Sequence, residues 1–187
     1  MKNKRTLITI KFLFLLLHLI YAPIALALVN QPDEESIRAA MVIGILRYAQ
    51  LPMAEDDKTI QVCSIGQPLV EDKLKTNISG LRVNRKKLEF KSFPSKLPIE
   101  NPIRCHVVIQ GENTNTDQFV KFLAETDQNM LVICDGCSTG LKLASVELFK
   151  RNNAISFKVN LDLAAQNRVV FSSSLLEIAS EIKGKSR

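Results

Sequence analysis

The stretch IRCHVVIQGENTNTDQFVKFLAETDQNMLVIC, residues Ile103–Cys134, decides the fold. Its two ends, IRCHVVIQ and MLVIC, are mostly apolar, which is typical of strands that are buried on both faces. The segment TDQFVKFLAET between them has helical spacing, with Thr116 as the expected N-cap. One face of this helix would be apolar and carry Phe119, Val120 and Leu123. The stretch therefore predicts two core strands joined by a helix.

Helix and strand signals also alternate upstream of this stretch. A first helix is expected between Asp33, as N-cap, and Pro52. Its apolar stripe would comprise Ile37, Ala40, Met41, Gly44, Ile45 and Tyr48. The runs TIQVCSIG (59–66) and KLEFKSF (87–93) predict strands, and Pro68 is expected to be the first residue of a helix between them.

The last third of the sequence has a different pattern. The runs SVELFK and ISFKVNL predict a β-hairpin, because the mostly polar residues 151–154 separate them. The segment SSSLLEIASEI then predicts a terminal helix with Ser172 or Ser173 as its cap. We therefore expect one α/β domain, with a mixed, largely parallel sheet flanked by helices and a C-terminal β-hairpin and helix.

The N-terminus has the pattern of a secretion signal. Four basic and no acidic side chains precede an apolar run that ends at Ala25-Leu26-Ala27, so we expect a signal peptide over residues 1–27 and an exported domain over residues 28–187. An uncleaved anchor is the alternative, since the apolar run approaches the roughly 18–20 residues that span a bilayer. Pro23 and the acidic residues that follow favour cleavage, which would leave no membrane-inserted segment.

Cleavage would remove most of the positive charge. The full chain has a net charge of +6, whereas the mature chain would hold 21 basic and 19 acidic side chains. This near balance gives no support to a nucleic-acid partner. The remaining basic cluster is expected to be the solvated surface of a turn or edge strand and comprises Arg82, Arg85, Lys86 and Lys87.

Four cysteines follow the signal: Cys63, Cys105, Cys134 and Cys137. In an oxidising compartment an even number of cysteines suggests disulfides, and four cysteines allow three pairings. The sequence alone does not choose among the pairings. Cys63 and Cys105 each lie in a predicted core strand, whereas Cys134 and Cys137 flank an Asp-Gly turn. We therefore expect Cys63 to bond to Cys105 and Cys134 to bond to Cys137.

The CDGC motif has two further interpretations. In a redox pair resembling that of thioredoxin, the reactive thiolate lies at a helix N-terminus. The segment STGLKLASVELF, which directly follows the motif, predicts loop and strand in place of such a helix. A zinc site needs about four ligands, and the mature chain has one CxxC and one histidine, His106, which is expected to be a hydrogen-bonded core residue. No G-x-S-x-G, P-loop or G-x-G-x-x-G motif occurs. We therefore expect no catalytic, cofactor-binding or metal-binding residues and no enzymatic activity.

These segments together resemble the YfiR family of small exported proteins. The resemblance begins in IRAAMVIGILRYAQLP (37–52) and continues through IQVCSIG, RCHVVIQ and MLVICD. It is strongest in ISFKVNLDLAAQNRVVFSSSLLEIA (155–179), which is similar to the family's strand, Ala-containing turn and S-S-x-L-L-x-x-A helix. Leu51 stands where the family usually has Trp, and the family's Gly pair before the hairpin is missing. The chain thus resembles a divergent member.

The resemblance implies a periplasmic regulator. It would bind the periplasmic sensor domain of an inner-membrane diguanylate cyclase and hold the cyclase inactive, which limits cyclic-di-GMP and biofilm growth. Homodimers are implied too, as are disulfides that couple folding to the redox state of the periplasm. Two other functions stay open: a periplasmic sensory domain for a small ligand, and a thiol oxidoreductase that uses Cys134 and Cys137.

Overall fold

The computed structural model of the chain describes residues 32–93, 104–125 and 129–184, so the expected signal peptide lies outside the described residues. In chain order the elements are α2 (Glu34–Arg47), β1 (Ala49–Gln50), β2 (Thr59–Ile65), α3 (Glu71–Asn77), β3 (Arg82–Val83), β4 (Lys86–Phe93), β5 (Val107–Gln110), α4 (Thr116–Glu125), β6 (Leu131–Asp135), η1 (Gly140–Lys142), β7 (Val146–Arg151), β8 (Ala154–Asn160), α5 (Leu161–Gln166), β9 (Val170–Phe171), α6 (Ser173–Glu177) and β10 (Glu181–Lys183).

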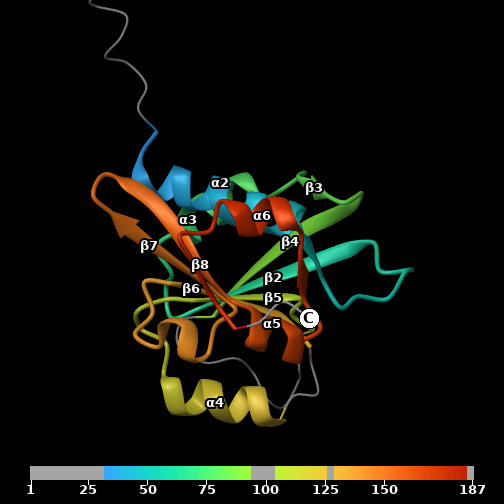
Figure 1. The fold of residues 1–187 in the computed structure, drawn as a ribbon. Helices are drawn as coiled ribbons and strands as arrows, with labels where there is room; N and C mark the ends of the chain where they lie inside the picture. The colour runs from blue at the N-terminus through green and yellow to red at the C-terminus, as the bar shows by residue number, and fades with distance from the viewer. Residues whose placement is uncertain (1–31, 94–103, 126–128, 185–187) are drawn as a thin grey trace, which may run out of the picture. The chain divides into compact units, whose positions relative to one another are not determined.

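The centre of the fold is an eight-stranded sheet with the order β10-β8-β7-β6-β5-β2-β4-β3 (Figure 1). The strands from β4 to β7 in this order pair in parallel, and β10 is parallel to β8. The hairpins β7–β8 and β3–β4 are antiparallel. This confirms the predicted α/β class, the mixed, largely parallel sheet and the hairpin in the last third of the chain.

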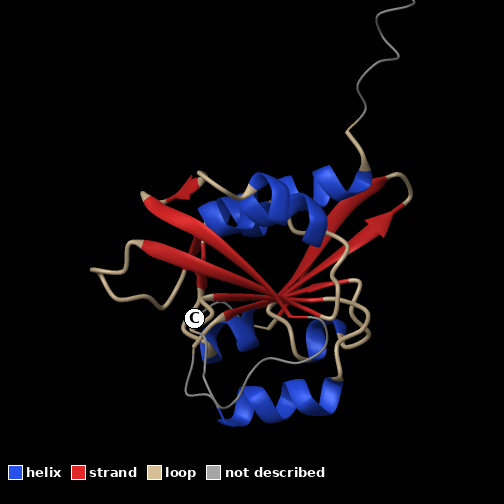
Figure 2. Ribbon diagram, turned by 180° about the vertical axis from the view of Figure 1, so that it is seen from behind, coloured by secondary structure: helices blue, strands red, loops and turns tan. Residues whose placement is uncertain are grey.

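Helices cover both faces of the sheet. Helices α2, α3 and α6 lie on one face and α4 lies on the other (Figures 1 and 2). Successive strand residues point to opposite faces. Leu131 and Ile133 of β6 pack in the hydrophobic cluster that contains the buried residues of α2 (the α2 cluster). Val132 and Cys134 pack in the cluster that contains the buried residues of α4 (the α4 cluster). Every residue of β5 and β6 is therefore buried, which explains their continuous apolar sequence.

Helix α2 buries a different face from the predicted stripe. Its buried residues are Arg38, Ala39, Val42, Ile45 and Leu46, whereas Tyr48 is 52% exposed. Because apolar residues lie nearly all round this helix, their spacing could not distinguish its faces. The helix also ends at Arg47 and not at Pro52, since Ala49 and Gln50 pair with β9 in a separate two-stranded sheet.

Helix α3 and strand β5 both begin later than predicted. Pro68 precedes α3, and its carbonyl accepts a hydrogen bond from the backbone N–H of Glu71 at 3.0 Å. This turn makes Glu71, and not Pro68, the first helical residue. Strand β5 begins at Val107, and the predicted start of that strand, Ile103, lies outside the described residues.

Helix α4 differs from the prediction in its cap and in its buried face. The helix begins at Thr116, and Oδ1 of Asn115 accepts a hydrogen bond from a first-turn N–H at 3.0 Å. Asn115 therefore caps the helix in place of Thr116. The buried residues are Phe119 and Phe122, whereas Val120 is 45% exposed, because residues three apart share a helix face.

The predicted terminal helix is shorter than expected and a strand follows it. Helix α6 is capped by Ser172, whose Oγ accepts a hydrogen bond from the N–H of Leu175 at 3.3 Å. The backbone N–H and the hydroxyl of Ser180 then donate to the carbonyl of Phe157, at 2.9 and 2.8 Å. Residues 181–183 continue as β10 along β8. Pairing with the edge of β8 thus overrides the local helical pattern.

Candidate functional site

The parallel strands β2, β5 and β6 end at the same edge of the sheet, at Ile65, Gln110 and Asp135. The strand order reverses between β2 and β5, because β4 lies on one side of β2 while β5 and β6 follow on the other. In open α/β sheets such a reversal usually leaves a crevice that binds a ligand. This edge is therefore where a small-ligand site would be expected.

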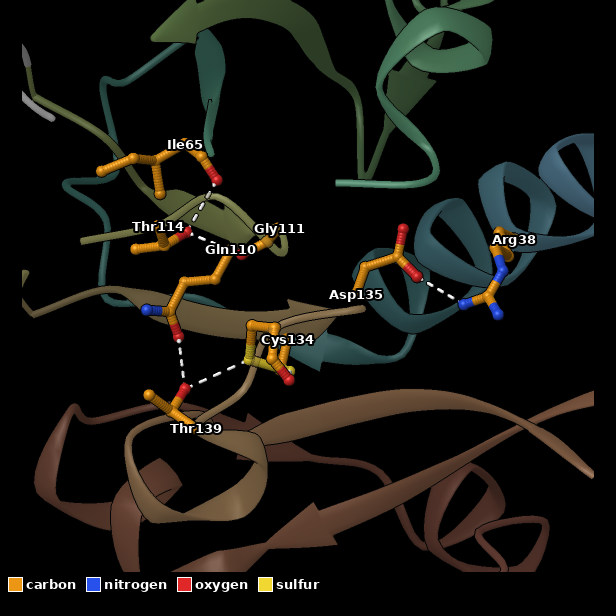
Figure 3. The surroundings of a disulfide bond; sticks show 9 residues. Arg38, Ile65, Gln110, Gly111, Thr114, Cys134, Asp135 and Thr139 are labelled. Atoms are coloured by element: carbon orange, nitrogen blue, oxygen red, sulfur yellow. Dashed lines mark hydrogen bonds and ion pairs between the residues drawn. A yellow bond between two sulfur atoms is a disulfide. The ribbon is translucent and has the colours of Figure 1, made fainter. Parts of the chain in front are cut away.

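The loops after β2 and β5 fill that crevice. The hydroxyl of Thr114 lies 3.0 Å from the carbonyl oxygen of Ile65 and 2.9 Å from that of Gly111 (Figure 3). A Cβ atom at Gly66 would lie 2.2 Å from the backbone nitrogen of Thr114, and one at Gly111 would lie 2.2 Å from the nitrogen of Pro68. The two loops pack backbone against backbone, which leaves no space between them for a ligand.

Cys134, near the end of β6, and Cys137, just beyond the strand, form a disulfide at this edge, with Cα atoms 5.4 Å apart. Cys134 is buried, and the Thr139 hydroxyl lies 3.1 Å from Sγ of Cys137 and 3.4 Å from Oε1 of Gln110 (Figure 3). The following segment contains a three-residue 3-10 helix and no α-helix. The pair therefore lacks the helix N-terminus that lowers the pKa of a reactive thiol, which weakens the oxidoreductase interpretation.

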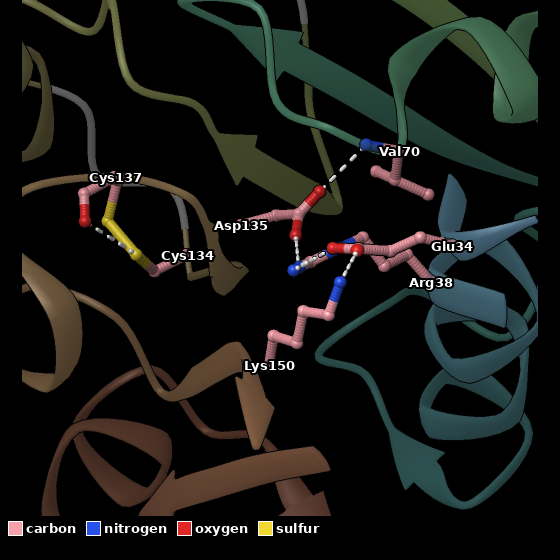
Figure 4. A network of polar contacts seen from close by, with 7 residues as sticks. All are labelled: Glu34, Arg38, Val70, Cys134, Asp135, Cys137 and Lys150. Atoms are coloured by element: carbon pink, nitrogen blue, oxygen red, sulfur yellow. Dashed lines mark hydrogen bonds and ion pairs between the residues drawn. A yellow bond between two sulfur atoms is a disulfide. The ribbon is translucent and has the colours of Figure 1, made fainter. Parts of the chain in front are cut away.

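On the other face of β6, Asp135 is the centre of a buried polar network (Figure 4). Its Oδ1 accepts a hydrogen bond from Nη1 of Arg38 at 2.5 Å, and its Oδ2 accepts one from the N–H of Val70 at 2.7 Å. Arg38 also donates to Glu34, at 2.8 and 3.0 Å, and Glu34 pairs with Lys150 at 2.7 Å. The network joins α2 to β6, to β7 and to the turn before α3.

The two carboxylates of this network are perturbed in opposite directions. Burial raises the pKa of Asp135, while the positive charge of Arg38 and the N–H of Val70 act against this rise. Hydrogen bonds from Lys150 and then from Arg38 lower the pKa of Glu34 at the surface. Arg38 thus favours the charged form of Asp135. The network stabilises the packing of α2 against the sheet.

The second disulfide joins Cys63 to Cys105, with Cα atoms 5.9 Å apart, so the pairings are those expected from the sequence. Both cysteines lie in the cluster between the sheet and α4. Beside them the buried His106 accepts a hydrogen bond at Nδ1 from the N–H of Gln61, at 3.0 Å. Its Nε2 lies 3.7 Å from the carboxylate of Asp57. Burial lowers the pKa of His106, which keeps the imidazole neutral at neutral pH.

The structure does not bring the two cysteine pairs into one site. Cys105 lies before the start of β5, whereas Cys134 pairs with the last residue of that strand. Sequence reasoning also missed the partners Arg38 and Asp135. The spacing along α2 gave no signal for Arg38, because apolar residues lie nearly all round that helix. In the described parts of the chain, no group of three His, Cys, Asp or Glu side chains is arranged to hold a metal ion.

The family of the chain follows from one comparison. A family model described as YfiR/HmsC-like matches residues 35–180. The chain belongs to this family. The match runs from the start of α2 to the residue before β10, and it therefore covers the filled crevice, the buried network and both disulfides of this YfiR/HmsC-like domain.

Family membership gives the function in general terms. YfiR-like proteins are periplasmic regulators of diguanylate cyclases, and the YfiR/HmsC-like chain is a regulator of this general kind. No curated protein matches its sequence. Within residues 32–93, 104–125 and 129–184, no helix of the YfiR/HmsC-like chain is long and apolar enough to cross a bilayer.

Proposed function

We propose that the mature chain, residues 28–187 after cleavage near Ala27, binds the periplasmic sensor domain of an inner-membrane diguanylate cyclase and holds the cyclase inactive. The observation that carries this proposal is the YfiR/HmsC-like match over residues 35–180. The filled crevice between β2 and β5 supports it, because the usual ligand site of an open α/β sheet is closed by Gly66, Gly111 and Thr114. The proposal includes a homodimer as the binding unit.

The repression would be a shift between two states of the cyclase. A bound protein changes such an equilibrium only by its difference in affinity for the two states. A regulator that binds the inactive state about a hundredfold more tightly than the active state can lower cyclase activity by at most about a hundredfold. No catalytic group on the regulator is needed for this effect.

Redox dependence would come from the disulfides. The pair Cys63 and Cys105 joins β2 to the segment before β5, and both residues are buried in the α4 cluster. Reduction would release a loop with a sequence separation of 42, so the reduced chain would be less stable. The oxidised, folded chain would therefore be the repressing form.

The test is a cyclase assay with the full-length membrane enzyme in lipid nanodiscs. Adding the mature, oxidised chain should lower the conversion of GTP to cyclic-di-GMP in a saturable way. Prior reduction, or the double variant Cys63→Ala and Cys105→Ala, should weaken the effect. An unchanged rate at saturating chain would overturn the proposal. Turnover of a disulfide substrate, or a small molecule that co-purifies with the native chain, would favour the other two functions.

A further inference from the structure

A groove follows β1 on the α2 side of the sheet. Its first part holds about 320 Å³ and is lined mainly by apolar side chains, among them Leu46, Leu51, Met53 and Ile60. A second part, also about 320 Å³, extends to Tyr48 and Val170. Ala49, Gln50 and Asn84 line both parts, so the two parts form one continuous groove between the end of α2 and the β3–β4 hairpin.

The outer face of the β1–β9 pair adds exposed apolar side chains to this groove. Ala49 lies opposite Phe171, and both are buried in the core. Side chains alternate along a strand, so the neighbouring positions face outward. Tyr48 is 52% and Val170 is 59% exposed. Exposed apolar side chains gathered beside a groove are typical of interaction surfaces.

The rim of the groove carries more positive than negative side chains. Arg47 lines the part near Tyr48, and Lys86 and Glu55 line the other part. Arg85 lines neither part, but it directly follows the lining residue Asn84 at the tip of the β3–β4 hairpin and is exposed there. Within the described residues, Arg47 and Arg85 make no ion pair with a carboxylate. Their charges are therefore available to a partner.

Arg85 also occupies a position that suits glycine. The hairpin turn has two residues, Asn84 and Arg85, with φ angles of 50° and 68°. Such turns favour Asn-Gly, because a side chain is unfavourable in the left-handed region at the second position. The side chain of Arg85 is exposed. Backbone strain that the fold does not need is an observation that points to function.

We infer that this groove docks an acidic segment with apolar side chains from the periplasmic domain of the cyclase, an inference that rests on the proposed function. Apolar side chains of the segment would fill the groove along Leu46 and Met53 and cover Tyr48 and Val170. Its carboxylates would pair with Arg47 and Arg85, since Nζ of Lys86 already donates to the backbone carbonyls of Ala54 and Asp57. The concave, two-part shape fits a peptide segment better than a flat anionic bilayer.

The test compares variants of the groove with matched variants elsewhere. The probe is the purified periplasmic domain of the cyclase, and calorimetry measures its affinity for the oxidised chain. Arg85→Glu and Val170→Asp should each weaken binding about tenfold, and the effect of Arg85→Glu should shrink at high salt. Arg151→Glu, at the tip of the β7–β8 hairpin, and Val120→Asp, on α4, should stay within about twofold of the unchanged chain.

Arg85→Gly separates binding from folding. Removing the strain at φ 68° should raise the Tm by roughly 2–4 °C, while the lost charge should weaken binding about threefold to tenfold. Wild-type affinity in both Arg85→Glu and Val170→Asp would overturn the docking surface and leave the proposed function standing. No binding by the unchanged chain would overturn both. Binding to phosphatidylglycerol vesicles that is lost in Arg85→Glu, with cyclase binding kept, would show that the groove serves a membrane instead.

Discussion

Nη1 of Arg38 lies 2.5 Å from Oδ1 of Asp135, although the two residues are 97 positions apart in the sequence. The two side chains are 4% and 0% exposed. This ion pair fastens α2 to the end of β6, on the face opposite to the Cys134 disulfide. Charges so deeply buried are tolerated only in pairs. Removing either side chain would therefore leave the other charge buried without a partner.

Arg38→Met should therefore destabilise the fold by about 3–5 kcal/mol, because it leaves the carboxylate of Asp135 buried and unpaired. Urea unfolding at neutral pH measures this cost. Lys150→Ala is the matched control, since it removes the exposed end of the same network and should cost less than about 1 kcal/mol.

The double variant Arg38→Met and Asp135→Asn tests the cause of that loss. An asparagine can still accept the hydrogen bond from Val70 and carries no charge, so the double variant should be more stable than Arg38→Met alone. The cost of Arg38→Met should also shrink as the pH falls. A carboxyl group whose pKa is higher in the folded than in the unfolded state stabilises the fold at low pH, and this stabilisation is lost as the pH rises. A double variant less stable than Arg38→Met would contradict the argument.

Glycine substitutions should measure how tightly the loops after β2 and β5 are packed. Gly66 and Gly80 both have positive φ, at 70° and 85°, but a Cβ atom at Gly80 would meet nothing within 4 Å. Gly80→Ala should cost about 1–2 kcal/mol from backbone strain alone. Gly66→Ala adds a clash with the backbone of Thr114 and should cost more than about 4 kcal/mol. Equal losses in thermal unfolding would mean that the crevice has room for a side chain.

The strands that form the core were predictable from the sequence because their physical cause is local. Strands β5 and β6 are covered on both faces, and burial on both faces gives an uninterrupted apolar run. The β7–β8 hairpin was equally clear, since the polar turn at Asn152 and Asn153 separates two short segments with apolar and polar residues interleaved. The cysteine pairing was expected from the placement of Cys63 and Cys105 in predicted core strands and of Cys134 and Cys137 around a turn, and the structure has these two disulfides.

What the sequence could not indicate depends on contacts between distant residues. Spacing along α2 did not reveal that Arg38 faces the core, because its partner Asp135 lies on a strand far along the chain. The segment Glu181–Lys183 is helical by its local pattern and forms β10 because β8 has an open edge beside it. The groove along β1 combines residues from α2, β1, β9 and the β3–β4 hairpin, which no single segment of the sequence indicates.

The two disulfides should contribute unequally to stability. They bridge sequence separations of 42 and 3 residues. In the chain-entropy model a loop of that longer size contributes about 4 kcal/mol and the shorter one about 2 kcal/mol. Replacing Cys63 and Cys105 by Ala should therefore lower the free energy of unfolding about 2 kcal/mol more than replacing Cys134 and Cys137. Urea titrations of both double variants measure the difference, and an equal loss would refute the entropic explanation.

Stability should fall as the periplasm becomes acidic, because of His106. Its pKa is lowered from the ordinary value of 6.5 by burial first, then by the charge of Arg104, and the opposing carboxylate of Asp57 does not cancel these effects.

Between the lowered pKa and 6.5 the unfolded chain binds more protons than the folded chain, so stability decreases as the pH falls through 6.5 and levels off below the folded pKa. Protonation would also remove a contact, because a protonated Nδ1 cannot accept the hydrogen bond from the N–H of Gln61. His106→Gln keeps an acceptor without the titration, so its urea midpoint should change less than that of the unchanged chain between about pH 7.5 and about pH 5.5. Identical pH profiles for the two proteins would show that other groups govern the acid sensitivity.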